Sequence, residues 1–308
     1  MTGRRVLVTG AGGFLGSHLC RRLTASGAEV HAVSRRPTAA HAAAARWWAI
    51  DLESEHEARE LLQAVKPDTV FHLGGLTDAS PDLRLVVPTF RSLLGSTIGV
   101  LAACAEEGCR RVVLAGSVEE PSISSPAVTP ASPYAAAKWA AGAYGRMFQT
   151  LYGTPVVIAR LALAYGPGQS ERKVIPATIL SALRGVPPRL SSGTRAWDLL
   201  YVDDAVEGLL CLAERPGLEG ATVGIGSGTA RPLREVLERA TRMVDPDLSP
   251  VFGAVPDRPL TTAGVIDAAA TEARIGWRST TSLESGLQRT IDWYRHRLGR
   301  GGDRGASA

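Results

Sequence analysis

The stretch TGAGGFLGSHL, residues 9–19, constrains the fold of this chain more than any other. It places Gly10, Gly13 and Gly16 between an apolar, β-branched run and a run with helical spacing that ends at Gly27. Glycines between a strand and a helix let the backbone approach a pyrophosphate, and the helix N-terminus offers free N–H groups. A plain tight turn is the alternative, but the strand and helix on either side favour dinucleotide binding.

The first half of the chain alternates short buried strands with helices. After the strand RRVLVTG, further strands are predicted at AEVHAVS, RWWAID, DTVFHLGG and RRVVLAGS, with helices near 55–65 and 86–108. Strand–helix alternation at this spacing indicates a parallel sheet with helices on both faces. We therefore predict an α/β fold with a doubly wound parallel sheet.

The second half is less regular. PVVIARLALAYGPG predicts a strand that runs into a loop, and LLYVDDAVEGLLCLAERPG predicts a strand followed by a helix that Asp203 or Asp204 caps. Further helices are expected at KVIPATILSALRG, RPLREVLERATRMV and SLESGLQRTIDWYRHRL. The tail 299–308 is expected to be disordered. We find no linker long enough to separate two independent domains.

Composition argues against several classes of function. The 308 residues carry a net charge of only +4, without a basic stripe interleaved with aromatics, which argues against nucleic acid as a partner. The four cysteines, Cys20, Cys104, Cys109 and Cys211, show no metal spacing and indicate reduced thiols in a cytoplasmic protein; no metal site is expected. The first strand begins by Arg5, which leaves no room for a signal peptide, and we find no apolar run of membrane length.

The end of the second strand bears on which dinucleotide is bound. An NAD site usually has an acid here for the ribose 2′-hydroxyl, whereas this chain has Ser34, Arg35 and Arg36. Arginines suit a 2′-phosphate, with which they form bidentate, charge-assisted hydrogen bonds. Two solvated arginines are the alternative, but the missing acid and the paired bases both favour NADP(H). Asp51, after the third strand, suits either the adenine amino group or the cap of the next helix.

SPYAAAKWA places Tyr134 and Lys138 four residues apart, on one face of a helix. The tyrosine pKa is ordinarily about 10, and a neighbouring ammonium lowers it, so the pair suits proton transfer to an alkoxide. Lysine also has a slim stem that reaches ribose hydroxyls. The chain has only three lysines, Lys66, Lys138 and Lys173, which supports a functional role for Lys138. The alternative is a core tyrosine beside a solvated lysine.

These segments, with AGS, LLYVDDAVEGL, GIGSG and IGWRSTTSLESGLQRTIDWY, occur in the order typical of extended short-chain dehydrogenase/reductases. The chain resembles this family of nucleotide-sugar epimerases, dehydratases and ketoreductases over nearly its whole length. The resemblance implies a Rossmann-type domain over 1–165, to which 196–217 returns, and a smaller C-terminal α/β substrate domain over 166–308. The active site is expected in the cleft between them, and a homodimer through the helices near 86–108 and 133–152.

The resemblance also implies functional residues. Ser117, Tyr134 and Lys138 match the catalytic positions. The expected cofactor-binding residues are Gly10, Gly13, Phe14, Leu15, Gly16, Ser34, Arg35, Arg36, Asp51, Leu52, Leu73, Gly74, Gly75, Tyr134 and Lys138. The candidate substrate residues are Thr77, Glu119, Lys173 and Arg195; Lys173, Arg172 and Arg195 suit a pyrophosphate or are ordinary surface charges.

The sequence departs from the family pattern on the substrate side. Where the sugar dehydratases have Asp then Glu after the hydroxyl residue, this chain has Val118 and Glu119, and Glu120 comes one place too late. Valine has no proton to give, so elimination of water is disfavoured. Glu119 either contacts substrate or binds backbone in the turn. Pro121, Leu163 and Trp197-Asp198 replace Tyr, Asn and Arg-Asp of the pattern.

The first interpretation of function is an NADPH-dependent reductase of a keto-sugar nucleotide, with an NDP-4-keto-6-deoxyhexose as substrate. A nucleotide-sugar 4-epimerase that recycles its own cofactor is the second. A reductase of a non-sugar ketone and a non-catalytic nucleotide sensor are further alternatives, because a fold alone does not establish catalysis.

Overall fold

The computed structural model describes residues 1–35, 45–121, 129–260 and 264–302 of the chain. Its large sheet has seven parallel strands in the order β3–β2–β1–β4–β5–β6–β9. The strands are β1 (Arg5–Thr9), β2 (Glu29–Val33), β3 (Arg46–Trp48), β4 (Thr69–His72), β5 (Arg111–Ser117), β6 (Val156–Leu161) and β9 (Thr222–Ile225). This confirms the predicted parallel sheet. The strand order reverses between β1 and β4, the place where open α/β sheets bind their ligands.

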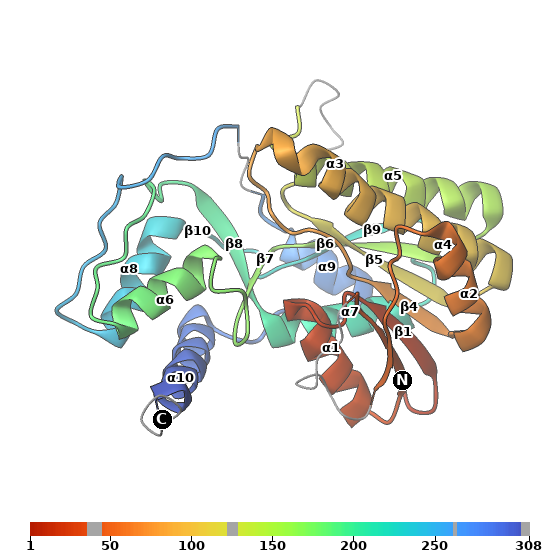
Figure 1. Ribbon diagram of the computed structural model, residues 1–308, viewed down its shortest axis with the longest axis horizontal. Coiled ribbons are helices and arrows are strands. Elements are labelled where there is room, and N and C mark those ends of the chain that lie inside the picture. The colour runs from red at the N-terminus through yellow and green to blue at the C-terminus, as the bar shows by residue number, and fades with distance from the viewer. Residues whose placement is uncertain (36–44, 122–128, 261–263, 303–308) are drawn as a thin grey trace.

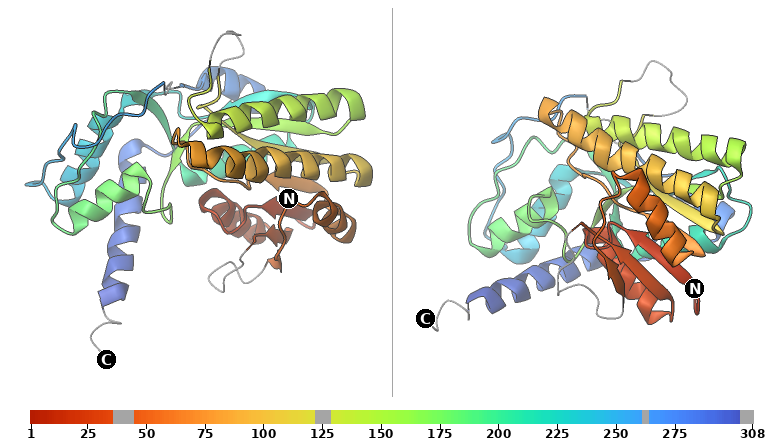
Figure 2. Two further views of the ribbon diagram at one scale, coloured as in Figure 1. Left: turned by 45° about the horizontal axis from the view of Figure 1, so that its top comes forward. Right: turned by 45° about the vertical axis from the view of Figure 1, so that its right-hand side comes forward.

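Helices cover both faces of this sheet (Figures 1 and 2). One face is covered by α1 (Phe14–Ala25) and α7 (Val202–Glu214), with α9 (Ala268–Ile275) beside β9. The other is covered by α2 (Glu55–Val65), α4 (Ser96–Glu107) and α5 (Pro133–Tyr152). The strands are apolar on both sides because each face of the sheet borders its own buried core.

The helical segment before β5 is long and irregular. It runs from Leu83 to Glu107 through η1 (Leu83–Leu85), α3 (Val86–Thr89), the π-helical turn η2 (Phe90–Gly95) and α4. By length and composition it is apolar enough to cross a membrane, so the expectation of no run of that length is wrong. In the fold it is a layer of the large domain, where α4 packs between α2 and α5.

A second, smaller unit lies at the carboxyl ends of the large sheet's strands (Figure 1). Its three strands are β10 (Ala230–Pro232), β8 (Ala196–Tyr201) and β7 (Leu163–Tyr165), and its helices are α6 (Val174–Leu183), α8 (Leu233–Val244) and α10 (Leu283–Gly302). Within the segment 196–217, α7 packs on α1 of the large domain, whereas β8 pairs with β7 and β10. The helix α10 includes residues 299–302, which were expected to be disordered; 303–308 lie outside the described residues.

The start of α7 corrects another prediction. Tyr201 is the N-cap, and neither Asp203 nor Asp204 caps the helix; both lie in its first turn. Asp204 accepts hydrogen bonds from Thr280 Oγ1 (3.1 Å) and Thr281 N (2.9 Å), and so holds the segment before α10. Both carboxylates bind partners that lie far along the chain, although their position near the start of the helix suits a cap.

Candidate active site

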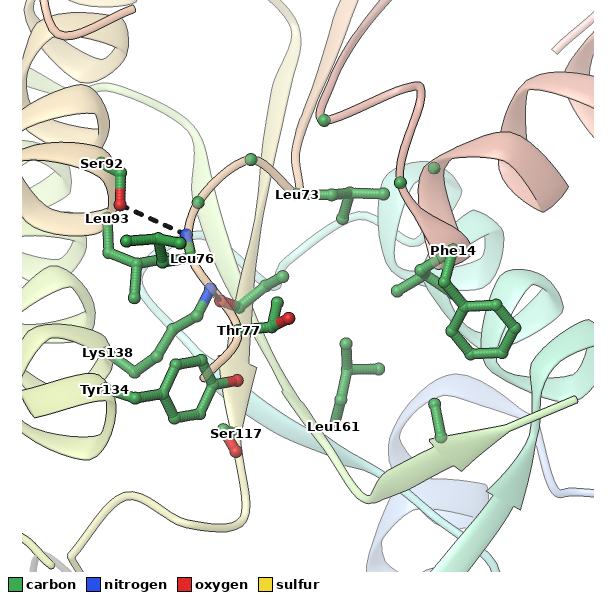
Figure 3. Close-up of a pocket in the computed structure, with 18 of the residues that line it drawn as sticks. Phe14, Leu73, Leu76, Thr77, Ser92, Leu93, Ser117, Tyr134, Lys138 and Leu161 are labelled. Atoms are coloured by element: carbon green, nitrogen blue, oxygen red, sulfur yellow. Dashed lines mark hydrogen bonds between the residues drawn. The ribbon is translucent and has the colours of Figure 1, made fainter. Parts of the chain in front are cut away.

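A cavity of about 1100 Å³ extends along the carboxyl ends of the central strands. The turns after β1, β2, β3, β4 and β5 form its floor, α5 forms one wall, and β7 and the loop before α6 close it from the smaller unit. Figure 3 shows this arrangement, with Phe14 of α1 opposite Tyr134 and Lys138 of α5. The elements that the sequence predicted separately thus meet around a single space.

Nearly all predicted site residues line this cavity. They are Gly10, Gly13, Phe14, Leu15, Gly16, Ser34, Arg35, Asp51, Leu52, Leu73, Gly74, Gly75, Thr77, Ser117, Glu119, Tyr134, Lys138 and Lys173. Asp51 does not cap α2, because Ser54 does, accepting from Glu57 N. Arg36 lies outside the described residues.

Arg195 does not line this cavity, and its role as a substrate residue stays a prediction. Its carbonyl accepts from Leu233 N (2.9 Å), and its charge helps to hold the pKa of Asp257 below the usual range, after hydrogen bonds from Ser192 and Ser191. Arg195 directly precedes β8, whose first three residues pair with β10.

The two glycine turns of the cofactor end touch one another. Gly10 has φ of +65°, and a Cβ there would lie 2.8 Å from Gly74 N. A Cβ on Gly16 would lie 2.2 Å from Gly10 O. Only glycine permits such close backbone packing, and the same cradle lets a pyrophosphate approach the N-terminus of α1. These residues therefore fit a dinucleotide.

Thr9 ties these two turns together, a role that the sequence did not indicate. Its Oγ1 accepts from Leu73 N (3.2 Å) and Gly74 N (3.1 Å), so its own proton goes to His72 Nδ1 (2.9 Å). Burial, and secondarily the charge of Lys138, lowers the pKa of His72 to about 3. His72 is therefore neutral and accepts at Nδ1, which keeps the threonine oriented toward the turn.

The proposed catalytic residues come from two elements. Ser132 begins α5 by accepting from Ala135 N (3.1 Å), and Pro133 occupies the first turn. One turn of this helix brings Tyr134 and Lys138 to the cavity, facing Ser117 at the end of β5 (Figure 3). Lys138 Nζ donates to Ala115 O (2.6 Å), so the ammonium is anchored to the strand that carries Ser117.

The electrostatics of this pair differ from expectation. Burial raises the pKa of Tyr134, a hydrogen bond with Ser117 opposes the shift, and Glu119 and Glu120 add to it. Burial also lowers the pKa of Lys138 to about 8, against the effect of Glu120. The expected lowering of the tyrosine pKa by the ammonium is not found, because loss of hydration dominates at both groups.

The two adjacent glutamates face different surroundings. Glu120 is buried outside the cavity, where its Oε1 accepts from Ser117 N (2.5 Å). Arg160 donates to the carbonyls of Glu120 (2.7 Å) and Ser117 (3.3 Å), which makes this corner rigid. Glu119 instead lines the cavity, and its backbone N–H donates to Ser117 Oγ (3.1 Å). The Glu119 side chain is therefore open to a ligand in the cavity, whereas that of Glu120 is not.

The charge of Arg258, a residue that the sequence analysis did not single out, acts on Glu119. Burial raises the pKa of Glu119, and the charges of Arg258 and Lys173 oppose this shift. Lys173 Nζ donates to Thr77 O (2.6 Å). Arg258 lies in the segment between α8 and α9, far along the chain from any motif used above. Among the described residues, no group of three or more His, Cys, Asp or Glu is placed to hold a metal ion.

Comparison with known proteins identifies the family. Residues 6–226 match the model of the NAD dependent epimerase/dehydratase family. The chain belongs to this family. Its members are nucleotide-sugar modifying enzymes, so this chain is an NAD(P)-dependent enzyme of the short-chain dehydrogenase/reductase type.

Relatives within the family carry out more than one reaction. A probable dTDP-glucose 4,6-dehydratase from Sinorhizobium fredii is 29% identical over 94% of this chain and 92% of its own length. The structure of MoeE5 in complex with UDP-glucose and NAD is 30% identical, with a TM-score of 0.84 over 95% of this chain and 99% of that chain. A UDP-glucose 4-epimerase from Thermus thermophilus, in complex with NAD, is 26% identical, with a TM-score of 0.80 over 94% of this chain and 99% of that chain.

Proposed function

We propose that this protein is an NADPH-dependent reductase of a keto-sugar nucleotide, with an NDP-4-keto-6-deoxyhexose as its substrate. The observation that carries the proposal is the environment of Ser117 and Tyr134. Val118, 4% exposed, lines the cavity directly after Ser117, and Glu120 is committed to the backbone behind it. Only Glu119 of this turn offers a carboxyl group to the cavity.

A single carboxyl group argues against dehydration. Loss of water from C6 and C5 of a hexose needs an acid for the departing oxygen and a base for the C5 hydrogen. Glu119 can serve as one of these but not as both at the same moment. Reduction of a ketone needs only one proton and one hydride.

The chain's own residues can provide everything in this reduction except the hydride, which the bound dinucleotide supplies. The raised pKa of Tyr134 keeps its hydroxyl protonated at neutral pH, as a proton donor requires. The Ser117 hydroxyl, positioned by the N–H of Glu119, orients and polarises the ketone oxygen. Lys138 places positive charge where negative charge develops on that oxygen.

The substrate end fits an anionic, partly deoxygenated ligand. Lys173 lines the cavity and provides one cation for a diphosphate, and the charge of Arg258 also acts on this region. Glu119 provides a partner for sugar hydroxyls. Val118, Leu161 and Leu163 add apolar surface to the cavity. Such surface suits a methyl group at C6 better than a hydroxyl group.

A 4-epimerase with a recycled cofactor is the second candidate. The observation in its favour is the similarity to structures described with bound NAD, one of them a UDP-glucose 4-epimerase. Our preference for NADPH rests on Arg35 at the cofactor end of the cavity and on the missing acid after β2.

Substrate turnover separates these reactions. We expect an NDP-4-keto-6-deoxyhexose to oxidise NADPH stoichiometrically, with less activity from NADH, and Tyr134→Phe to lower the rate by about two or more orders of magnitude. Interconversion of sugars without net NADPH use would instead establish the epimerase. Loss of one water per NDP-hexose with an intact C6 hydroxyl, faster than any ketone reduction, would establish a dehydratase. Near-normal turnover in Tyr134→Phe would place the acid elsewhere.

We further propose a cytoplasmic homodimer. The outer faces of the Leu83–Glu107 helical segment and of α5, which lie side by side in Figures 1 and 2, expose apolar side chains. These are Leu83, Val86, Val87, Phe90, Trp139, Tyr144, Leu151 and Tyr152, here called the helical patch. Exposed apolar side chains on neighbouring helical segments commonly mark a protein–protein interface.

A further inference from the structure

A second hollow of about 240 Å³ opens beside the cofactor end of the cavity. It is lined by Arg35, Glu53, Leu76, Val87, Pro88, Arg91 and Ser92, and is called the arginine recess below. Four of these residues, Arg35, Glu53, Leu76 and Ser92, also line the main cavity, so the two spaces adjoin. A ligand in the main cavity can therefore extend a substituent into the recess.

The π-helical turn η2 brings Arg91 to this recess. Ser92 Oγ accepts from Leu76 N at 3.2 Å, drawn in Figure 3, which binds the turn to the segment after β4. Leu93 packs on Gly75, where a Cβ would lie 2.0 Å from its Cδ2. Two consecutive residues are thus fixed against the cavity wall, and Arg91 precedes them at the rim. Single π-helical turns are rare and frequently occur at functional sites.

The charges of the recess suit an anion. Within the described parts of the chain, Arg35 and Arg91 have no ion-pair partner. Arg84, on the same helical segment, is instead paired with Asp82 at 2.6 Å. Glu53 contributes one exposed carboxylate, so two guanidinium groups and one carboxylate leave the recess with net positive charge. A 2′-hydroxyl needs no such surplus, whereas a phosphate monoester carries about −1.5 to −2 at neutral pH.

We propose that Arg91, together with Arg35, binds the 2′-phosphate of NADPH in the arginine recess and so contributes to cofactor specificity. This inference rests on the proposed NADPH preference and adds to it a residue more than 50 positions away from the end of β2. Arg35 approaches the phosphate from the β2 side, and Arg91 approaches it from η2. Glu53 disfavours the phosphate, and its charge limits how tightly the cofactor binds.

Direct binding measurements on the full chain test the inference. Dissociation constants for NADPH, NADH, 2′,5′-ADP and 5′-AMP are measured by calorimetry for the wild type and four variants. We expect Arg91→Ala to raise the dissociation constants of NADPH and 2′,5′-ADP by about tenfold, the loss typical of one charge-assisted hydrogen bond. The dissociation constants of NADH and 5′-AMP should change less than about twofold. Arg35→Ala should have the same effects, and Glu53→Gln should lower the dissociation constant of NADPH by about threefold. Arg84→Ala is the matched control and should change neither cofactor.

The outcomes separate the two levels of the proposal. If the wild type binds both cofactors equally, the NADPH preference itself is wrong and the inference falls with it. If the wild type prefers NADPH but Arg91→Ala leaves the ratio unchanged, only the inference is overturned. Equal losses for 2′,5′-ADP and 5′-AMP in Arg91→Ala would place this side chain on the adenosine and would also overturn it. Weaker NADPH binding in Glu53→Gln counts against the recess as a phosphate site.

Discussion

At the scale of single residues, burial opposes charge in the Tyr134–Lys138 pair. Both side chains lie buried in a wall of the cavity, so the tyrosine stays protonated and the lysine holds its proton weakly. Arginine does not lose its proton in this range. Two of the three lysines in the chain line the cavity. A side chain that can lose its proton is therefore concentrated at this site, in a chain that otherwise uses arginine for positive charge.

The lysine predicts a pH dependence. Its ammonium is the protonated form, so positive charge beside Tyr134 is present below a pKa of about 8 and is lost above it. We expect the rate of ketone reduction to be level on the acid side of that value and to fall on the alkaline side. Lys138→Arg keeps a permanent charge, so its residual activity should lack the alkaline fall. An unchanged alkaline limb in Lys138→Arg would assign the titration to another group.

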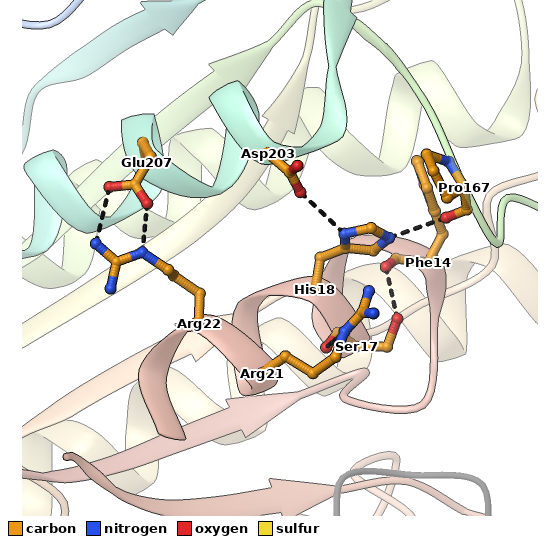
Figure 4. A network of polar contacts seen from close by, with 8 residues as sticks. All are labelled: Phe14, Ser17, His18, Arg21, Arg22, Pro167, Asp203 and Glu207. Atoms are coloured by element: carbon orange, nitrogen blue, oxygen red, sulfur yellow. Dashed lines mark hydrogen bonds and ion pairs between the residues drawn. The ribbon is translucent and has the colours of Figure 1, made fainter. Parts of the chain in front are cut away.

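At the scale of elements, His18 links the helix α1 to the loop before α6. Figure 4 shows its ring between α7 and the loop before α6. Nδ1 lies 3.2 Å from Asp203 Oδ1, and Nε2 donates to Pro167 O at 2.9 Å. The loop that begins at Pro167 continues into Gly168, Gln169 and Ser170, which line the cavity. The position of this loop therefore depends on a side chain of α1.

His18→Ala should loosen that loop. We expect a loss of about 1–2 kcal/mol in the free energy of unfolding, from two hydrogen bonds of which one is partly buried, and a raised KM for the sugar substrate. Urea denaturation and steady-state kinetics measure the two effects. Arg22→Ala is the control on the same helix, because its exposed pair with Glu207 should contribute less than about 1 kcal/mol. Equal effects of both variants on KM would show that His18 has no special role.

At the scale of the whole molecule, the helical patch predicts the oligomeric state. Phe90 belongs to this patch, is 55% exposed, and should be covered in a dimer. We expect the wild type to run as a dimer in size-exclusion chromatography with light scattering, and Phe90→Glu to run as a monomer because a buried carboxylate is costly. Val186→Glu, at an exposed apolar residue away from the patch, should remain dimeric. A monomeric wild type would contradict the proposal.

Local patterns predicted most elements of this fold correctly. The glycine turn, the buried strands and the amphipathic helices follow from spacing over a few residues, and the structure places each near its expected range. Where prediction was wrong, the deciding partner lies far along the chain. Asp204, for example, binds Thr281 instead of capping α7.

The sequence by itself determined the parallel sheet, the dinucleotide end and the residues of the candidate catalytic set, because these depend on short-range periodicity and on motif spacing. Only the tertiary structure decided which of two adjacent glutamates faces the cavity, that Thr9 ties the two glycine turns together, and that the charge of Arg258 acts on Glu119. Hydrogen bonds and charges act over a few ångströms of space, and chain separation does not limit them. Such partners become visible only when the fold brings distant segments together.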